Sequence, residues 1–220
     1  MREEIAATTD DFGVGVRRVS GVVLAAGGSR RLGRPKQLLD LGGEPLLRHT
    51  VRSAVASSLD DVIVVLGSRA AEIAAAVGAL GQRTVVNPAF AEGQSTSLVA
   101  GIAVVSAETG AVLVLLGDQP LVSSAAIDRV VEAWREHQTS IVQAAYCGER
   151  GNPVLFDRSL FAELGAVAGD EGARSVVRRH RDEVALVEVG DVARVIDVDT
   201  EEDYARLLDL WGRLSGDGVE

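Results

Sequence analysis

Five short apolar runs, rich in β-branched residues, constrain the fold of this chain more than any other feature. They are GVVLAA at 21–26, DVIVVLG at 61–67, RTVVN at 83–87, AVLVLLG at 111–117 and SIVQAAY at 140–146. No polar residue alternates with the apolar ones in VIVVL or VLVLL, which is typical of strands covered on both faces. The runs therefore predict a mainly parallel β-sheet with helices on both sides.

Segments of helical character separate these runs. They are 45–58, with Pro45 at the first helical position, 70–80, 95–107, and 123–137, with Ser123 or Ser124 as its cap. Strands and helices that alternate over short connections imply right-handed crossovers. The predicted fold class is α/β: a three-layer α/β/α arrangement around a doubly wound, mostly parallel sheet.

The pattern becomes less regular after Tyr146. CGERGNPVLF reads as a turn followed by an extended segment, and two short helices then precede a strand at 183–189 and a final helix at 201–214. The two ends of the chain are polar and rich in acids and glycine. We expect one domain over residues 19–214, a flexible extension over 1–18 and a flexible tail over 215–220.

Composition excludes several classes of protein. The 220 residues carry a net charge of -10, which disfavours binding to nucleic acid or to anionic membranes. Cys147 is the only cysteine, so the chain has no internal disulfide and no thiolate metal cage. No apolar run reaches the roughly 18 residues of a membrane span, and no signal peptide is recognisable. We expect a cytoplasmic protein.

A basic loop stands out in this acidic chain. GGSRRLGRPK at 27–36 directly follows the first predicted strand and contains Arg30, Arg31, Arg34 and Lys36. In an open parallel sheet, ligands bind beyond the carboxyl ends of the strands, where this loop lies. Its glycines allow backbone amides to approach an oxyanion, while Arg31 and Lys36 supply charge, a combination suited to a triphosphate. A solvated basic loop is the alternative.

The loop fits neither of the two common phosphate-binding patterns. Arg34 and Pro35 stand where a P-loop requires lysine and then serine or threonine, and no G-x-G-x-x-G follows the strand. A dehydrogenase of the usual dinucleotide-binding kind is therefore not supported.

Acidic residues occur at two places that the predicted topology brings near the loop. Asp118 follows a buried run, either as a turn residue before Pro120 or as a ligand for a hard cation. Asp197 and Asp199 lie on one side if their segment is extended, although Asp199 or Thr200 would also serve as a helix cap. Since Mg²⁺ takes one or two carboxylates together with substrate phosphates, the acids together predict a metal site facing the loop.

Six stretches in order carry a family resemblance: LAAGGSRRLGRPKQLL, NPAFAEGQSTSLVAGI, LLGDQPLV, GNPVLF, GDEGAR and DVDTEEDY. The set resembles the MobA-like NTP transferases, and within them most closely the molybdenum cofactor cytidylyltransferases. The resemblance covers residues 20 to about 210 and implies the Rossmann-type fold of the nucleotide-diphospho-sugar transferases.

The resemblance also implies roles for individual residues. Nucleotide binding falls to Leu24, Ala25, Ala26 and Gly27 near base and ribose, Ser29, Arg31 and Lys36 at the phosphates, and Gly93 and Ser97 at the nucleoside. Catalysis falls to Arg31, Lys36 and Asp118, and Mg²⁺ or Mn²⁺ to Asp118 and Asp199 with Asp197 as a neighbouring candidate. The acceptor side comprises Asn152, Gly172 and Arg174, although histidine is expected where Asn152 stands.

The implied reaction is transfer of CMP from CTP to the terminal phosphate of molybdopterin, with release of pyrophosphate. A molybdoenzyme that receives the product is the implied partner. A phosphate monoester with a second pKa of about 6 is already mostly dianionic at neutral pH, so no protein base is required. Ala26 before Gly27 favours CTP. The alternatives are a guanylyltransferase, a sugar-phosphate nucleotidyltransferase, and a non-catalytic nucleotide-binding regulator of the same fold.

Overall fold

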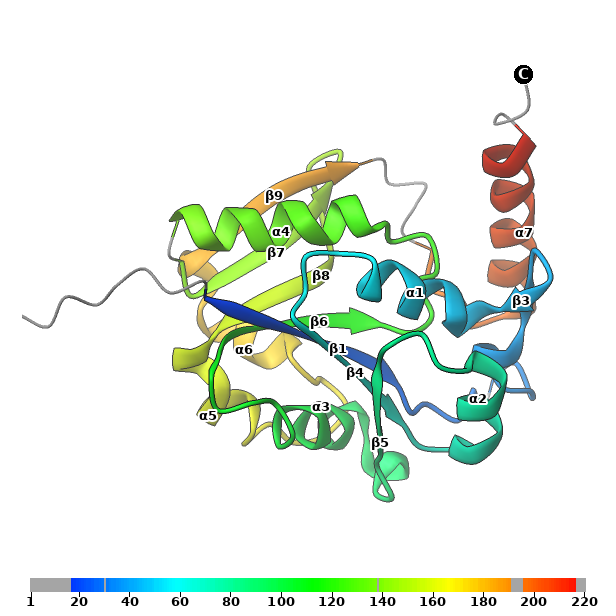
Figure 1. Cartoon of the computed structure of the whole chain (residues 1–220), viewed down its shortest axis with the longest axis horizontal. Coiled ribbons are helices and arrows are strands. Elements are labelled where there is room, and N and C mark those ends of the chain that lie inside the picture. Colours follow the sequence, from blue (N-terminus) through cyan, green and yellow to red (C-terminus); the bar gives the residue numbers. More distant parts are fainter. Residues whose placement is uncertain (1–16, 30, 138, 191–195, 217–220) are drawn as a thin grey trace, which may run out of the picture.

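The computed structural model describes residues 17–29, 31–137, 139–190 and 196–216 (Figure 1). Arg30 and most of the two expected flexible ends lie outside these ranges. The strands are β1 (Arg18–Ala25), β2 (Asp40–Leu41), β3 (Glu44–Pro45), β4 (Asp61–Leu66), β5 (Arg83–Val86), β6 (Thr109–Leu116), β7 (Ile141–Tyr146), β8 (Glu149–Asp157) and β9 (Val184–Gly190). The helices are α1 (Leu46–Val55), α2 (Ala70–Val77), α3 (Gln94–Ile102), α4 (Ser124–His137), α5 (Phe161–Leu164), α6 (Arg174–Arg179) and α7 (Glu201–Gly216).

Seven strands form the central sheet in the order β5-β4-β1-β6-β8-β7-β9. β1 pairs parallel with β4 and β6, β4 with β5, and β7 with β9, whereas β8 runs antiparallel to both β6 and β7. The predicted mostly parallel α/β sheet is therefore confirmed. The antiparallel strand is the extended segment expected after Tyr146, and it lies inside the sheet.

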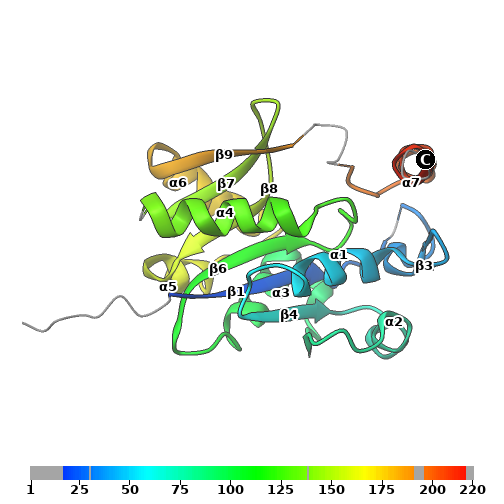
Figure 2. The same ribbon diagram turned by 45° about the horizontal axis from the view of Figure 1, so that its top comes forward.

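Two groups of helices cover the sheet. Buried side chains of α1, α2 and α4, such as Leu47, Ile73 and Trp134, pack on one face. Those of α3, α5 and α6, such as Leu98 and Val176, pack on the other. Figure 2 shows α1 and α4 on the near side of the sheet and α3 behind it. Because both faces are covered, the strands can be continuously apolar.

Helix α7 packs apart from these layers, beside the β2–β3 hairpin (Figures 1 and 2). Leu207 and Trp211 of α7 join Leu41 and Leu46 in a separate apolar cluster. The hairpin turn passes so close that a Cβ on Gly42 would lie 2.7 Å from Trp211 Nε1. This docking holds the segment before α7 against the basic loop.

Two helix starts test the predicted caps. Ser123 Oγ accepts from the Ala126 backbone amide at 3.2 Å, so Ser123 caps α4. Pro45 was expected as the first helical residue of α1, which is wrong by one position. Pro45 pairs with Asp40 in the β2–β3 hairpin and precedes the helix, because the hairpin keeps its backbone extended.

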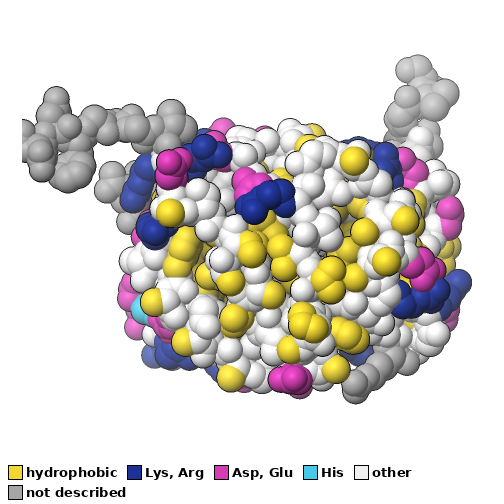
Figure 3. Space-filling view, turned by 60° about the horizontal axis from the view of Figure 1, so that its bottom comes forward, with side chains coloured by type: hydrophobic (Ala, Val, Ile, Leu, Met, Phe, Trp, Pro, Cys, Tyr) yellow, Lys and Arg dark blue, Asp and Glu magenta, His cyan; other side chains and the backbone are white. Residues whose placement is uncertain are grey.

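Figure 3 looks onto the side of α3 and α5, where hydrophobic side chains reach the surface and charged ones lie mainly toward the margin. Val86, at the end of β5, and Val104, just after α3, are among the exposed large hydrophobic side chains. Within the described residues, no helix is both long and apolar enough to cross a bilayer.

Candidate functional site

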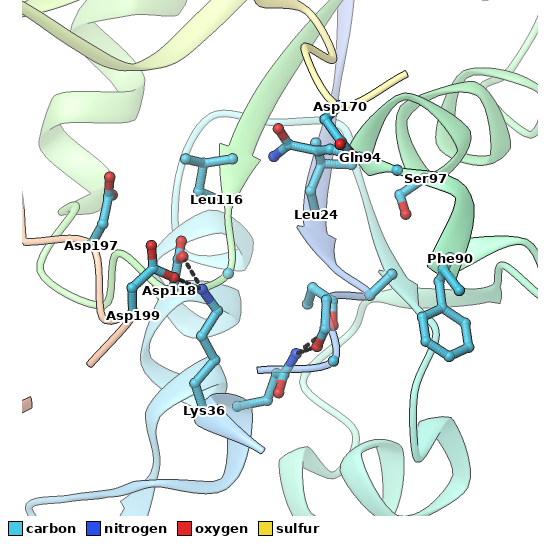
Figure 4. A pocket seen from close by; sticks show the side chains of 18 of the residues that line it. Leu24, Lys36, Phe90, Gln94, Ser97, Leu116, Asp118, Asp170, Asp197 and Asp199 are labelled. Carbon is cyan, nitrogen blue, oxygen red and sulfur yellow. Dashed lines mark hydrogen bonds and ion pairs between the residues drawn. The ribbon is translucent and has the colours of Figure 1, made fainter. Parts of the chain in front are cut away.

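A pocket of about 450 Å³ opens where β1 and β6 end (Figure 4). The loop after β1, the start of α3, the residues after β6 and the segment before α7 contribute to its walls. Lys36, Asp118 and Asp199 meet at one end of the pocket, while Phe90 and Ser97 lie at the other. This position beyond the carboxyl ends of parallel strands is where such sheets bind ligands.

The loop after β1 is held by its own side chains. Gln37 is buried and donates through Nε2 to the carbonyl oxygens of Ala25, at 2.8 Å, and Gly27, at 3.0 Å. Ser29 has a positive φ of 51°, and its hydroxyl accepts from the Lys36 backbone amide at 3.0 Å. These contacts fold the basic loop back so that the Lys36 side chain enters the pocket.

Lys36 joins two carboxylates that are far apart in the sequence. Its Nζ lies 2.5 Å from Asp118 Oδ2 and 2.8 Å from Asp199 Oδ1. The side chains of Lys36 and Asp118 are each only 16% exposed. Burial works to lower the pKa of the Lys36 ammonium, but the charges and hydrogen bonds of Asp118 and Asp199 outweigh it, so the pKa is raised. The lysine is therefore a fixed cation.

Thr200, and not Asp199, caps helix α7, so the Asp199 carboxylate remains available to the pocket. Thr200 Oγ1 accepts a hydrogen bond from the Asp203 backbone amide at 3.1 Å. In return, Asp203 Oδ2 accepts one from the Thr200 backbone amide at 2.9 Å. Arg31 donates to Asp199 Oδ2 at 2.7 Å. Burial acts to raise the pKa of the Asp199 carboxyl, yet the Lys36 hydrogen bond and charge prevail, and the pKa is lowered.

Asp197 lies at the same end of the pocket as Asp118 and Asp199, but within the described structure no hydrogen bond or ion pair joins it to Lys36 (Figure 4). Its Oδ1 accepts from Gln119 Nε2 at 2.6 Å. Burial, together with the negative charge of Asp118, raises the pKa of the Asp197 carboxyl. Of the three aspartates, Asp197 is thus the one not paired with Lys36.

The donor set suits a hard divalent cation. Asp118 and Asp199 each bring an oxygen within hydrogen-bond distance of one cationic atom, so both carboxylates can reach a common positive centre. Across the described ranges, no group of three or more histidine, cysteine or acidic residues could by itself hold a metal ion. The two carboxylates therefore fit a cation that is also bound by substrate oxygens, which is the coordination that Mg²⁺ prefers.

The far end of the pocket is shaped by close backbone contacts. Gly93 has φ of +121°, and a Cβ there would lie 2.6 Å from the Gly169 carbonyl oxygen. Asn87 is buried and donates through Nδ2 to Ser97 Oγ at 3.0 Å. The Ser97 hydroxyl is therefore fixed where it lines the pocket.

A second pocket of about 510 Å³ adjoins the first. Both are lined by Leu24, Gln94, Leu116, Arg174 and Asp197. The second extends from this shared wall over β8 and α6 and includes Asn152. Two ligands bound in the two pockets would meet at the shared wall, near Lys36, Asp118 and Asp199.

Comparison with known proteins gives the family. Residues 21–184 match the MobA-like NTP transferase domain. The chain belongs to the MobA-like NTP transferase family. Nicotine blue oxidoreductase from Paenarthrobacter nicotinovorans is 35% identical over 199 residues, which are 86% of this chain and 96% of that protein.

Two solved structures share the fold of this MobA-like chain. Rv0371C from Mycobacterium tuberculosis H37Rv, in complex with manganese, has a TM-score of 0.75 and 32% identity, over 88% of this chain and 98% of that one. A nucleotidyl transferase from Methanothermobacter thermautotroptrophicus has a TM-score of 0.77 and 26% identity, over 90% and 99% of the two chains. Each therefore aligns with most of this chain and with nearly all of its own.

The structure brings most of the residues predicted for the MobA-like site together. The first pocket is lined by Leu24, Ala25, Ala26, Gly27, Lys36, Gly93, Ser97, Asp118, Arg174, Asp197 and Asp199. Asn152 lies in the second pocket. Ser29, Arg31 and Gly172 line neither of these two: Ser29 supports Lys36, Arg31 pairs with Asp199 on the surface, and Gly172 donates to Ser95 Oγ at 3.1 Å.

Several lining residues were not anticipated from the sequence. Phe90, Gln94 and Asp170 belong to the first pocket, and Gln143 and Arg150 to the second. Gln94 begins α3 directly after the predicted Gly93, so that adjacency was an available signal. Gln143 and Arg150 are lone polar residues in strands, and only the antiparallel pairing of β7 and β8 directs them to the site.

Proposed function

We propose that this protein is a cytidylyltransferase that moves CMP from CTP to the terminal phosphate of a molybdopterin-type acceptor, releasing pyrophosphate. The observation that carries the proposal is the meeting of Lys36 with Asp118 and Asp199 at the junction of two adjoining pockets. Membership of the MobA-like NTP transferase family supports a nucleotidyl transfer. CTP, molybdopterin and a receiving molybdoenzyme are our specific assignments.

The first pocket suits a nucleoside triphosphate. A nucleoside near Ser97 and Phe90 would direct its phosphates toward Lys36, past the backbone of Gly27 and Gly28. The lining holds Lys36 and Arg174 but also four aspartates, so a polyanion would be held by Lys36 together with a divalent cation on the carboxylates. Lys36 would then exchange its carboxylate partners for phosphate oxygens.

The chemistry needs positioning more than proton transfer. An oxygen of the acceptor phosphate attacks the α-phosphorus of CTP, a new P–O–P bond forms, and the bond to the β-phosphate breaks. The acceptor is mostly dianionic at neutral pH, since its second pKa is about 6. Lys36 and Arg31 would stabilise the charge that grows on the departing pyrophosphate.

Asp118 and Asp199 would hold a divalent cation, with Asp197 as the neighbouring candidate. Such an ion neutralises phosphate charge and orients the phosphates. The manganese complex of Rv0371C is a related structure with a metal of this class. We propose Mg²⁺ or Mn²⁺ for this chain.

Ala26 supports CTP over GTP, on the basis of the family pattern in the loop. Asn152 lines the second pocket, which supports its placement on the acceptor side. The cytoplasmic location stays a prediction.

A panel of substrates tests the proposal. The protein is incubated with each of the four nucleoside triphosphates and a divalent cation, with purified molybdopterin or a sugar phosphate as acceptor, and pyrophosphate is measured. We expect release with CTP and molybdopterin. A preference for GTP would indicate a guanylyltransferase, and a preference for the sugar phosphate would indicate a sugar-phosphate nucleotidyltransferase. If no pair releases pyrophosphate, the remaining alternative is a non-catalytic nucleotide-binding regulator.

Lys36→Ala and Asp118→Ala test the roles of these residues. Loss of one such charged group commonly reduces turnover about 100- to 1,000-fold. We expect both variants to remain folded and to lose turnover on this scale. Near-normal rates in either would refute its role.

A redox function is the second candidate, because the 35% identical relative is named an oxidoreductase. The loop after β1 lacks the glycine pattern of common dinucleotide sites, which disfavours it. Reduced nicotinamide dinucleotides with an oxidised dye acceptor are therefore added to the panel. Their oxidation without any pyrophosphate release would favour this candidate.

A further inference from the structure

One acidic side chain of the first pocket lies apart from the other aspartates. Asp170 lines this pocket and does not line the second. It lies with Gln94 and Ser97 at the end where the proposed function places the nucleoside, whereas Lys36 and Asp118 meet at the other end (Figure 4). The carboxylate of Asp170 is therefore separated from the lysine and from the carboxylates that would hold a cation.

The loop that carries Asp170 is fixed to the start of α3 by a buried serine. The Ser95 backbone amide donates to the Gly169 carbonyl oxygen at 3.1 Å. On the other side of Asp170, the Gly172 backbone amide donates to Ser95 Oγ, also at 3.1 Å. Ser95 is completely buried, so these two hydrogen bonds are shielded from water. One serine thus holds the backbone on both sides of Asp170.

The Asp170 carboxylate occupies space that only a glycine at position 93 leaves open. A Cβ on Gly93 would lie 2.7 Å from Asp170 Oδ1 and 2.6 Å from the Gly169 carbonyl oxygen. Gly93 also has a φ of +121°, which other residues rarely adopt. Gly93 and Ser97 line the pocket beside Asp170. The carboxylate is therefore held against the backbone that begins α3, at the nucleoside end of the pocket.

An ionised carboxylate differs from its polar neighbours in what it can recognise. The amide of Gln94 and the hydroxyl of Ser97 can each donate or accept a hydrogen bond, whereas an aspartate can only accept. Asp170 therefore distinguishes a ligand group that donates from one that only accepts. Ionised phosphates offer acceptors, so the donors of a nucleoside triphosphate are the ribose hydroxyls and the amino group of the base. Carboxylates pair with both kinds of donor.

We propose that Asp170 determines nucleotide specificity in the first pocket, where its carboxylate accepts a hydrogen bond from a donor group of the nucleoside. That group is a ribose hydroxyl or the amino group of the base. The inference deepens the proposed function, because it rests on the binding of a nucleoside triphosphate with its phosphates at Lys36. It does not depend on the acceptor or on the transfer step.

Calorimetric titration of the full-length protein with nucleotides and Mg²⁺, without any acceptor, tests the inference. The ligands are CTP, UTP, which lacks the amino group, and the 2′-deoxy and 3′-deoxy forms of CTP, which each lack one hydroxyl. We expect at least one analogue to bind the wild type about tenfold more weakly than CTP, as for a lost hydrogen bond to a charged group. Asp170→Ala should weaken CTP by a similar factor and leave the affinity for that analogue unchanged. The analogue that behaves in this way identifies the donor.

A conservative variant and a surface control accompany the test. Asp170→Asn keeps an acceptor oxygen without the charge, so its loss of CTP affinity should be smaller than that of Asp170→Ala. Both variants should keep the wild-type thermal midpoint, because Asp170 is an exposed loop residue. Asp182→Ala is the matched control and should bind CTP like the wild type, since Asp182 has a 91% exposed side chain and lines neither pocket. If the substrate panel selects GTP, then ITP and the deoxy forms of GTP take the place of these analogues.

Wild-type nucleotide affinity in Asp170→Ala, or an equal loss for the nucleotide and all of its analogues, would overturn the inference. The outcome also separates the inference from the proposed function. The expected binding pattern in a protein that releases no pyrophosphate would uphold the role of Asp170 and reject the transferase. Pyrophosphate release together with unchanged nucleotide affinity in Asp170→Ala would uphold the transferase and reject the role of Asp170.

Discussion

Replacing Lys36 with methionine tests the cation at the centre of the site through stability alone. Methionine keeps an unbranched apolar side chain but removes the ammonium that lies between Asp118 and Asp199. The two carboxylates are then left near each other without their shared counter-charge. The nucleotide-free protein should become less stable.

The magnitude follows from burial. A hydrogen bond to a charged group contributes about 1.5–3 kcal/mol. The bond from Lys36 to Asp118 counts in full, because both side chains are only 16% exposed. Asp199 is 36% exposed, so its bond adds no more than about 1 kcal/mol. We expect Lys36→Met to lower the free energy of unfolding by about 2–4 kcal/mol.

The loss should also depend on pH. The pKa of Asp199 is lowered in the folded protein, so its contribution exists above the unfolded value of about 3.9 and disappears as the pH falls through the folded pKa. The raised pKa of Lys36 makes its contribution complete below about pH 10.4 and lost as the pH rises through the folded pKa. The difference between variant and wild type is therefore largest between these limits.

Urea denaturation at about pH 7 and about pH 3 measures the effect, with Arg31→Met as control. Arg31 is 70% exposed, so removing its pair with Asp199 should cost less than about 1 kcal/mol. A Lys36→Met loss below about 1 kcal/mol at neutral pH, or an equal loss at both pH values, would refute this account of the cluster.

Three further predictions concern the surroundings of the site. Gly93→Ala should destabilise the protein by more than about 2 kcal/mol in urea melts and weaken nucleotide binding, because the new Cβ would meet the Gly169 carbonyl oxygen at 2.6 Å; wild-type stability would show that the loop yields freely. Gly42→Ala should lower the thermal midpoint, since its Cβ would press on the Trp211 indole; an unchanged midpoint contradicts tight docking of α7. His180 has a pKa raised by hydrogen bonds to Glu183 and Glu163, so its charged form stabilises the fold below about pH 6.5 and the gain vanishes as the pH rises through the folded pKa. His180→Gln should thus lower stability at about pH 5.5 but not at about pH 9, and a pH-independent difference would count against the pairing.

The sheet could be predicted from the sequence because strands covered on both faces must be apolar throughout. The runs around Val64 and Val114 show this directly, and both lie in central strands. The antiparallel course of β8 between β6 and β7 could not be derived, because the local sequence of a strand does not specify which other strands it pairs with. Pro45 was misplaced for a similar reason: its pairing with Asp40 depends on the hairpin.

The approach of Lys36 to Asp118 could be predicted from one rule, that the loops after parallel strands share an edge of the sheet, whereas Asp199 lies in the segment before α7 and its role came from the family resemblance. That rule does not identify the amides and arginines that line the second pocket. Gln143 lies within a strand, and Arg150 near a hairpin turn resembles an ordinary surface charge until β7 and β8 are paired. No fixed spacing in the sequence marks side chains that come together only after their strands have paired.

The most direct test of the account is the Mn²⁺ electron paramagnetic resonance spectrum of the protein with α,β-methylene CTP, which cannot release pyrophosphate. We predict a protein-bound Mn²⁺ with ³¹P hyperfine coupling that needs the nucleotide and is lost in Asp118→Asn and Asp199→Asn. Bound Mn²⁺ that is unaffected by either substitution, or that shows no coupling to phosphorus, would contradict a polyphosphate held between Lys36 and these carboxylates.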